Sequence, residues 1–450
     1  MQTSRNPFLF RIVVPVIIVF LVFQLPAQAQ TISARIDKEI SQYERHLDDL
    51  YLYLHQHPEL SFMETNTSAR MQQEAEDAGF TVTPHFGGNS LVAVLKNGRG
   101  PVIMVRTDMD ALPLEEKTDL PYASRVVTKT REGVEMHAMH ACGHDIHMSV
   151  WSGVAHTMAA LKDQWHGTLI MIAQQAEERS GGAREMIKAG IFRKFPVPGY
   201  ILAFHVMPDL PVGTVGYGMG PVFAGVNSVD ITVYGKGGHG AYPHKTIDPI
   251  VLSARTIMAF QTIVSRELNP LDPAVISVGS IHGGTKHNII PDEVKMQITV
   301  RFYKDEVFNH IKNAMERITK GIAISAGLPE DRWPVVHVAD EFTPPLINNP
   351  GLAEKCLNIW KTEEPALTLQ KVDPQMAGED FSLYGRTPEK IPVFMFRVGT
   401  ASPDEYAANQ TGEKLLPALH SPHYAPHYKE AIPTGIRAMA SAVIGLFQGK

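Results

Sequence analysis

The chain contains 450 residues, which is more than one ordinary domain holds, so we expect two domains. Hydrophobic residues make up 44% and charged residues 20%, a balance typical of a soluble globular protein. The formal net charge is −6, and neither sign forms a long run. This composition gives no support for nucleic-acid binding, so we expect no nucleic-acid partner.

The first 29 residues differ in kind from the rest. Arg5 and Arg11 precede an apolar run over 12–25, which is followed by Pro-Ala-Gln-Ala at 26–29. A basic start, an apolar centre and a small-x-small end predict a signal peptide over 1–29, removed from an exported protein that is periplasmic or secreted. An uncleaved membrane anchor is the alternative. No second long apolar segment follows, so we expect no membrane partner after cleavage.

Two helical patterns and four apolar runs follow this segment. Apolar residues recur at helical spacing over 35–57, and a second helix is expected over 66–79. The apolar runs have the length of strands and lie at 91–95, 101–106, 167–173 and 200–206. Continuous apolar runs separated by helical stretches are typical of strands buried on both faces. They predict an α/β domain with a sheet between layers of helices.

Three of these runs end in side chains that can bind metals. Asp108 and Asp110 follow the second run, Glu177 and Glu178 follow the third, and His205 lies in the fourth. In open α/β sheets the functional crevice lies beyond the carboxyl ends of the strands. We therefore expect these side chains to meet at one edge of the sheet.

The segment His-Ala-Met-His-Ala-Cys-Gly-His-Asp-Ile-His at 137–147 is the strongest single signal in the chain. Imidazole, thiolate and carboxylate groups bind divalent transition metals, and Gly143 allows a bend that turns Cys142 and His144 toward one point. A histidine-rich surface loop is the alternative. The other cysteine, Cys356, lies in a helical pattern, so no disulfide framework is expected.

A different pattern runs from 222 to 337. It predicts the order β-α-β-β-α-β, with elements at 228–234, 248–266, 274–281, 293–302, 307–325 and 334–338. We interpret 222–337 as an inserted α+β domain with its own sheet. Residues 30–221 and 338–450 then form the metal-binding domain together.

The candidate ligands outnumber the positions of one closed tetrahedral site. They are Asp108, Asp110, Cys142, His144, Glu177, Glu178, His205 and His420. Such a set suits two metal ions that share ligands and leave one position open. An adjacent Glu-Glu pair fits, because one carboxylate can bind metal while its neighbour takes a proton from water. A solvated surface pair is the alternative, but an apolar strand precedes the pair and a glycine turn follows it.

Eight ordered motifs resemble one known family. They lie at 106–113, 140–147, 176–178, 204–206, 237–244, 288–292, 378–381 and 419–422. From about residue 35 onward the chain resembles the aminoacylase and carboxypeptidase family of two-metal amidohydrolases. Within it, the motifs are most similar to the branch of hippurate hydrolases and plant indole-acetyl-amino-acid hydrolases. The resemblance implies an exopeptidase-like α/β fold with a mixed sheet, whose inserted domain serves as a lid and as the contact of a homodimer.

The resemblance also implies a role for individual residues. It implies that Cys142, His144, Glu178, His205 and His420 bind two divalent metal ions. Their mixed sulfur, nitrogen and oxygen atoms favour zinc or manganese and also admit cobalt or nickel. Glu177 would act as the general base, and Asp110 would orient a ligand. His239 and Asn288, in the inserted domain, would contact the substrate or the oxyanion, and His239 can serve the partner's site.

The activity expected from these roles is hydrolysis of the amide bond of N-acyl amino acids, hippurate-like or related conjugates, by metal-activated water with Glu177 as the base. A dipeptidase or carboxypeptidase with the same site is the alternative. A secreted metal-binding protein without turnover is a remote alternative, because pure binding needs no base such as Glu177. Arg179, Ser180 and Met207 depart from the residues usual in the branch, which leaves the acyl and amino-acid preference open.

Overall fold

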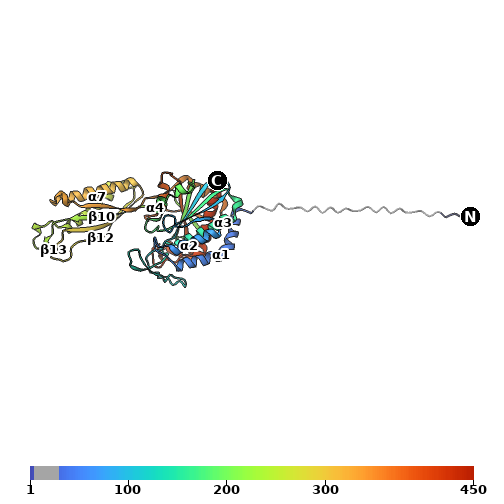
Figure 1. Ribbon diagram of the computed structural model, residues 1–450, viewed down its shortest axis with the longest axis horizontal. Coiled ribbons are helices and arrows are strands. Elements are labelled where there is room, and N and C mark those ends of the chain that lie inside the picture. Colours follow the sequence, from blue (N-terminus) through green and yellow to red (C-terminus); the bar gives the residue numbers. More distant parts are fainter. Residues whose placement is uncertain (5–29) are drawn as a thin grey trace.

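The computed structural model describes residues 1–4 and 30–450. The predicted signal peptide therefore lies almost wholly outside the described residues. Within that part of the chain, no helix combines the length and apolar character needed to cross a lipid bilayer. The described chain forms two domains that lie end to end, one built on an eight-stranded sheet and the other on a four-stranded sheet (Figure 1).

The larger sheet is mixed. Its strands, in spatial order, are β1 (Thr81–Thr83), β2 (Leu91–Asn97), β6 (Gly167–Gln174), β3 (Val102–Asp108), β7 (Tyr200–Pro211), β18 (Val393–Ala401), β8 (Thr214–Tyr217) and β17 (Thr368–Lys371). The central strands β6, β3, β7 and β18 run parallel, whereas β2 and β8 are antiparallel to their inner neighbours. This architecture confirms the predicted α/β fold, and it brings the carboxyl ends of β6, β3 and β7 to one edge.

Both faces of this sheet are buried, which explains the continuous apolar runs. In β6, Leu169 and Met171 belong to one core cluster, whereas Ile170 and Ile172 belong to another, because successive side chains point to opposite faces. The first cluster is covered by α1 (Ile32–Gln56), α3 (His144–Ala160), α8 (Pro350–Glu363) and α10 (Tyr428–Phe447). The second is covered by α4 (Gly182–Lys188) and α5 (Ile191–Lys194).

The helices predicted near the N-terminus form as α1 and as α2 (Thr65–Asp77). The side chain of Thr31 caps α1 by accepting a hydrogen bond from the Ala34 amide at 3.2 Å, which sets where the helix begins. Ile36, Leu50 and Leu54 recur at helical spacing and are fully buried in the first core cluster.

The smaller domain has an antiparallel sheet with two helices on one face. The sheet order is β12 (Ala274–His282), β14 (Glu293–Phe302), β10 (Gly225–Tyr234) and β15 (Val335–Thr343). The helices α6 (Pro249–Thr262) and α7 (Asp305–Ser325) complete its core. The sheet spans 225–343, whereas the sequence pattern placed the domain at 222–337, because β15 continues to Thr343.

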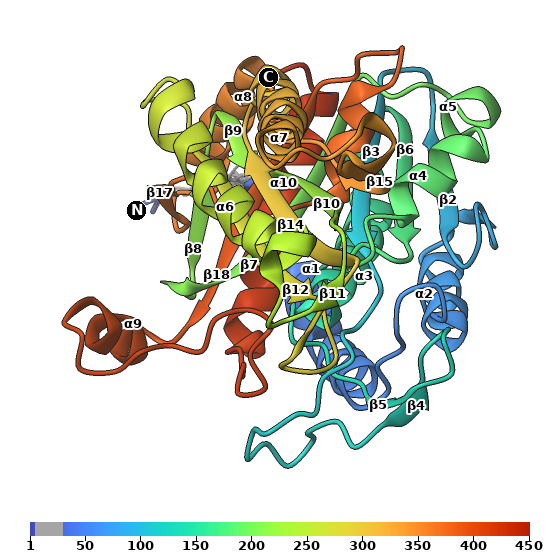
Figure 2. The same cartoon turned by 90° about the vertical axis from the view of Figure 1, so that its left-hand side faces the viewer.

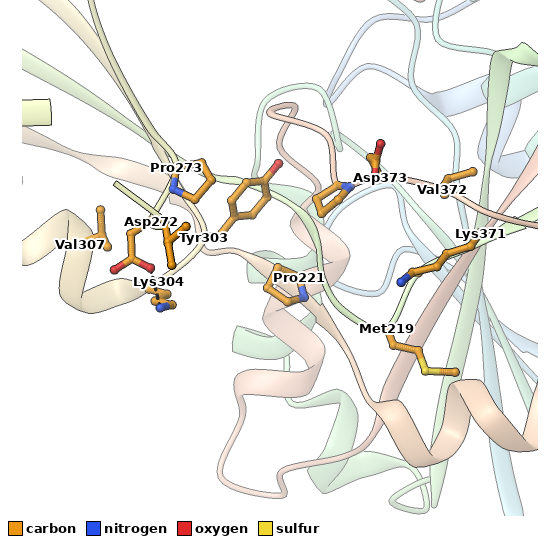
Figure 3. A pocket seen from close by; sticks show the side chains of 13 residues that line it. Met219, Pro221, Asp272, Pro273, Tyr303, Lys304, Val307, Lys371, Val372 and Asp373 are labelled. Carbon is orange, nitrogen blue, oxygen red and sulfur yellow. Dashed lines mark hydrogen bonds and ion pairs between the residues drawn. The ribbon is translucent and has the colours of Figure 1, made fainter. Parts of the chain in front are cut away.

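A cavity of about 380 Å³ lies where the two domains join (Figure 3). Tyr303 and Lys304 line it from the smaller domain, and Pro221 and Lys371 line it from the larger one. Lys304 forms an ion pair at 2.6 Å with Asp272, which lines the cavity from the same domain. None of the side chains expected to bind metal or substrate lines the cavity, so it belongs to the domain junction and not to the metal-binding edge.

A buried ion cluster fixes α1 against the first turn of α3. His55 Nδ1 lies 2.7 Å from Asp145 Oδ2, and His55 Nε2 lies 3.3 Å from Glu116 Oε2. Burial lowers the pKa of His55, but hydrogen bonds to Asp145 and Glu116 outweigh burial and raise it to about 9. The imidazole is therefore protonated at neutral pH and donates to both carboxylates.

We expect the fold to lose the stabilisation that this cluster provides when the pH becomes alkaline. The folded pKa of His55 lies above its ordinary value of about 6.5, so the stabilisation is complete below about pH 6.5 and is lost as the pH rises through about 9. The loss should be on the order of 3 kcal/mol. Urea unfolding of the wild type and of His55→Gln across this range measures it. If the free energy of unfolding of His55→Gln falls equally steeply at alkaline pH, groups other than His55 cause the loss.

Candidate metal centre

The strand order brings the predicted ligands to one edge of the larger sheet. The neighbouring parallel strands β6, β3 and β7 are each followed by or contain a candidate ligand. Glu177 and Glu178 follow β6, Asp110 follows β3, and His205 lies in β7. The amino-terminal end of α3 adds Cys142 and His144, and His420 comes from the loop before α10.

The five predicted ligands lie together in one cluster. Cys142 Sγ is 3.5 Å from His205 Nε2, and His420 Nε2 is 3.4 Å from Glu178 Oε1. His144 Nε2 lies 4.0 Å from the same glutamate oxygen. The ligand atoms of Cys142, His144 and His205 lie within 4.8 Å of one another, and so do those of Cys142, Glu178 and His420. Two overlapping ligand sets that share Cys142 therefore meet at this edge.

Two buried polar atoms of the cluster point to bound cations. Among the described residues, His144 Nε2 and Glu178 Oε1 are buried and have no hydrogen-bond partner. Such atoms are costly to bury unless a ligand or ion satisfies them. The donor set of one sulfur, three imidazole nitrogens and a carboxylate suits zinc and its neighbours in the first transition row. The residues present thus fit a two-metal centre.

The local backbone explains why Cys142 and His144 face the same point. Gly143 has φ 77° and precedes the first turn of α3, and a Cβ built there would lie 2.6 Å from Val206 Cγ2. Only glycine combines this left-handed conformation with so close an approach. The turn at Gly143 therefore directs the Cys142 thiol and the His144 imidazole toward the same point.

Backbone carbonyl groups hold the Nδ1 atoms of His144 and His205, so that the Nε2 atom of each ring faces the cluster. His144 Nδ1 lies 2.7 Å from the carbonyl oxygen of Asp110, and His205 Nδ1 lies 2.8 Å from the carbonyl oxygen of Val206. Each Nδ1 can donate to its carbonyl, which fixes the tautomer and leaves an Nε2 lone pair for an ion. The backbone thus orients both imidazoles toward the cluster.

Asp110 positions the two glutamates. Its Oδ1 accepts a hydrogen bond from the Glu177 amide at 3.0 Å, and its Oδ2 accepts one from the Glu178 amide at 3.0 Å. Ser61 Oγ donates a third bond at 2.6 Å. Burial raises the pKa of Asp110, but the His144 and Ser61 bonds outweigh it, so the net shift is downward. Asp110 therefore holds the backbone of Glu177 and Glu178 in place, and its orienting role in catalysis stays a prediction.

Asp108 has other partners than a metal. Arg106 Nη1 donates to its Oδ2 at 2.6 Å, and His147 Nδ1 lies 2.7 Å from its Oδ1. Burial opposes ionisation, but His144, His147 and Arg106 hold the pKa of Asp108 well below its usual range. Its two oxygens thus link Arg106 to α3, beside His144.

Glu177 is buried among other acidic groups. Burial raises the pKa of Glu177 well above its usual range, and the carboxylates of Glu379, Glu178 and Asp380 raise it further, while Arg106 opposes the shift. Among the described residues no hydrogen bond uses its carboxylate. The Glu177 carboxyl thus lies beside the ligand set with a raised affinity for a proton, and its role as general base stays a prediction.

A buried ion network behind Glu177 was not assigned from the sequence. Arg106 Nη2 donates to Glu379 at 3.0 Å and to Asp380 at 3.1 Å, and Gln174 Nε2 donates to Asp380 at 2.7 Å. His147 was also missed, although it lies three residues after His144 and so on the same side of α3. Arg106 lies in the same motif as Asp108 and Asp110, and this position is the feature of the sequence that indicates a place near the site.

His239 and Asn288 lie elsewhere. Both are exposed, and they meet where β11 (Gly238–His239) pairs with β13 (Ile289–Ile290), since the Gly240 amide donates to the Asn288 carbonyl at 2.9 Å. This pair lies at the end of the smaller domain that is remote from the larger one (Figure 1). Seen from that end, the smaller domain stands in front of the metal-binding domain (Figure 2). Within one chain these two side chains are not brought to the cluster.

The fold and the cluster define a metal-dependent hydrolase that acts on amide bonds. The sequence model of peptidase family M20/M25/M40 matches residues 104–444, and the chain belongs to that family. It is 36% identical over 359 residues to N-acetylcysteine deacetylase of Bacillus subtilis, a match that covers 78% of this chain and 88% of the relative. Thermostable carboxypeptidase 1 of Saccharolobus solfataricus is 34% identical over 370 residues, with 81% and 88% covered.

One solved structure supports the two-metal arrangement. A dinuclear metal-binding peptidase of the M20 family from Bacillus subtilis superposes with a TM-score of 0.74 at 28% identity, covering 91% of this chain and 99% of that one. The predicted class, an amide-bond hydrolase with a two-metal fold, is confirmed over the alternative of a metal-binding protein without turnover. The assignment to the hippurate and indole-acetyl-amino-acid branch stays a prediction.

Proposed function

We propose that the protein hydrolyses the amide bond of N-acyl amino acids with small acyl groups. The observation that carries this proposal is the free carboxylate of Glu177 beside five metal ligands, with both glutamates held in place by Asp110. The deacetylase relative supports the substrate class. The hippurate-like benzoyl conjugates expected from the motifs are a variant of the same chemistry.

The five ligands would hold two divalent ions, with zinc or manganese proposed first and cobalt or nickel as alternatives. When bound, such ions polarise the amide carbonyl and make water acidic near neutral pH. Glu177 then accepts the proton of the attacking water and passes it to the leaving amine as the C–N bond breaks. Asp110 keeps Glu177 in position for both transfers through the hydrogen bond to its amide.

Cys142 does not act as a nucleophile in this proposal. Burial raises the pKa of the Cys142 thiol well above its usual range, and the carboxylates of Glu178 and Glu177 raise it further. Its Sγ faces His205 Nε2 within the ligand set. A thiol in this environment ionises only when a cation holds it, and a thiolate held in this way is a poor attacking group.

Hydrolysis rates on a matched panel test the substrate class. The panel pairs N-acetyl and N-benzoyl forms of the same amino acids with dipeptides of the same C-terminal residue. We expect the highest kcat/KM on acyl amino acids. Preference for the dipeptides would replace the proposal with the dipeptidase or carboxypeptidase alternative, which the carboxypeptidase relative supports.

The exposed position of His239 supports a role in the site of a partner chain. We propose that two chains form a homodimer in which His239 and Asn288 of one chain reach the cluster of the other, where His239 stabilises the oxyanion. His239→Ala should then lower kcat by about ten- to a thousandfold with unchanged metal content, as for loss of one oxyanion donor. His244→Ala, in the same exposed loop, is the matched control.

Subunit exchange between two inactive variants tests the dimer. When His239→Ala is mixed with Glu177→Gln, one site of each mixed dimer combines an intact His239 with an intact Glu177. Activity should therefore return on mixing. No recovery despite proven exchange of subunits would show that His239 acts within its own chain or has no catalytic role.

We also propose that the protein is exported and that 1–29 is removed on the way. The basic, apolar and small-residue pattern of that segment supports this. N-terminal sequencing of the mature protein tests it: a first residue near 30 fits cleavage, and an intact N-terminus recovered with membranes fits the anchor alternative.

A further inference from the structure

Three helices of the larger domain bring together a second group of metal-binding side chains. His46 lies on α1, Glu74 on α2 and His156 on α3. One ligand atom from each lies within 4.8 Å of the other two. None of these residues belongs to the motifs discussed above, and none contacts the five ligands of the metal centre.

The contacts within this group leave one nitrogen unsatisfied. His46 Nε2 lies 2.8 Å from Glu74 Oε2, which is a hydrogen-bonded ion pair. His156 Nε2 lies 3.9 Å from the same oxygen, too far for a hydrogen bond. His156 is only 8% exposed, and within the described part of the chain its Nε2 has no hydrogen-bond partner. A buried nitrogen that faces a carboxylate without a hydrogen bond to it needs another partner.

The surroundings hold the carboxylate in place. Ser152 Oγ donates to Glu74 Oε2 at 2.6 Å, and Arg70 Nε donates to the other oxygen, Oε1, at 2.9 Å. The ring of Tyr43 packs against His156 with 4.1 Å between centroids and fixes the plane of the imidazole. Neighbours that orient ligands without binding the ion are typical of metal sites.

We propose that His46, Glu74 and His156 bind a divalent transition-metal ion at a site separate from the catalytic centre. In tetrahedral coordination at zinc bond lengths, two ligand atoms lie roughly 3.3 Å apart. The two distances to Glu74, 2.8 Å and 3.9 Å, bracket this value, and the ligand atoms of the two imidazoles lie within 4.8 Å of each other. Two imidazoles and one carboxylate select zinc, cobalt, nickel or copper over magnesium and calcium.

The position of the site decides its role. His156 follows His144 by twelve residues on α3, a distance of about 18 Å along the helix. An ion there cannot share ligands with the catalytic centre, and it would tie α1 and α2 to the helix that carries His144. The His46 side chain is 40% exposed, so the ion can be reached from solvent. We assign the site a stabilising role, with no part in the hydrolytic step.

Counting bound metal in matched variants tests the site. Protein is stripped with chelator, saturated with zinc above neutral pH, where imidazoles are unprotonated, and freed of unbound ions before elemental analysis. We expect His46→Ala to bind one zinc ion fewer per chain than the wild type and to keep its hydrolytic rate. His310→Ala is the control, because His310 also pairs with a glutamate, Glu267, at 3.2 Å but without a third ligand; its zinc count should equal that of the wild type.

A thermal measurement accompanies the count. Saturating zinc should raise the midpoint of unfolding of the wild type and of His310→Ala more than that of His46→Ala. His46→Gln repeats both measurements if the alanine variant folds poorly. Equal zinc counts in the wild type and in the folded His46 variant would overturn the proposal. Loss of hydrolysis together with the ion would also overturn it, because the ion would then belong to the catalytic centre. The count needs no substrate, so it stands or falls independently of the proposed function.

Discussion

Glu177→Gln should keep its metal ions and lose about a hundredfold or more of kcat, because the change removes a base and no ligand. Glutamine has the same shape as glutamate, and among the described residues no hydrogen bond to the Glu177 carboxylate would be broken. The backbone bond from the Glu177 amide to Asp110 is also unaffected. Steady-state kinetics with metal analysis of the same sample measures both quantities.

Two further variants separate the roles of the adjacent glutamates. Glu178→Gln should lose bound metal, because its Oε1 lies among the ligand atoms of His144 and His420. Glu132→Gln, at an exposed position, should change neither metal content nor rate. If Glu177→Gln instead loses metal and keeps its rate per bound ion, the roles of the two glutamates are reversed.

Arg106→Met should be the most destabilising substitution near the site. The Arg106 guanidinium is buried and pairs with Asp108, Glu379 and Asp380 at 2.6, 3.0 and 3.1 Å. Removing one partner of a buried ion cluster leaves uncompensated charge and costs about 3–5 kcal/mol. Urea unfolding of the larger domain, followed by circular dichroism, should show this loss.

The pH dependence of the loss gives a check on its cause. Burial raises the pKa of Glu379 to about 7 and that of Asp380 to about 6 even with Arg106 present. Without the cation these carboxyls hold their protons more tightly in the folded state than in the unfolded chain, so the variant should regain stability as the pH falls through about 7 toward the ordinary carboxyl range. Arg125→Met, at an exposed position, should stay within about 0.5 kcal/mol of the wild type. A similarly small effect of Arg106→Met would contradict the account of the network.

The sequence predicted those parts of the site that follow from local pattern. Apolar runs such as 167–173 become central strands because alternate residues enter two separate cores. The ligand types after these runs meet because parallel neighbours end at the same edge. The turn at Gly143 follows from the one residue that tolerates its backbone conformation.

Contacts between distant segments could not be predicted in this way. Arg106 reaches Glu379 and Asp380 across more than 270 residues, and no spacing in the sequence encodes that approach. The group of His46, Glu74 and His156 likewise depends on how three helices pack. For His239 the difficulty is different. Its motif is easily recognised in the sequence, but whether it reaches a metal centre depends on how two chains associate.

The most direct test of a two-metal amide hydrolase combines metal content and turnover in one sample. Protein stripped with chelator should have no activity on an N-acetyl amino acid, and activity should return in step with the zinc or manganese bound. Glu177→Gln treated in the same way should bind the same metal without regaining the rate. Full activity in the stripped wild type would contradict the account, because in it Glu177 deprotonates water that the bound ions have made acidic, and Glu177 alone does not suffice.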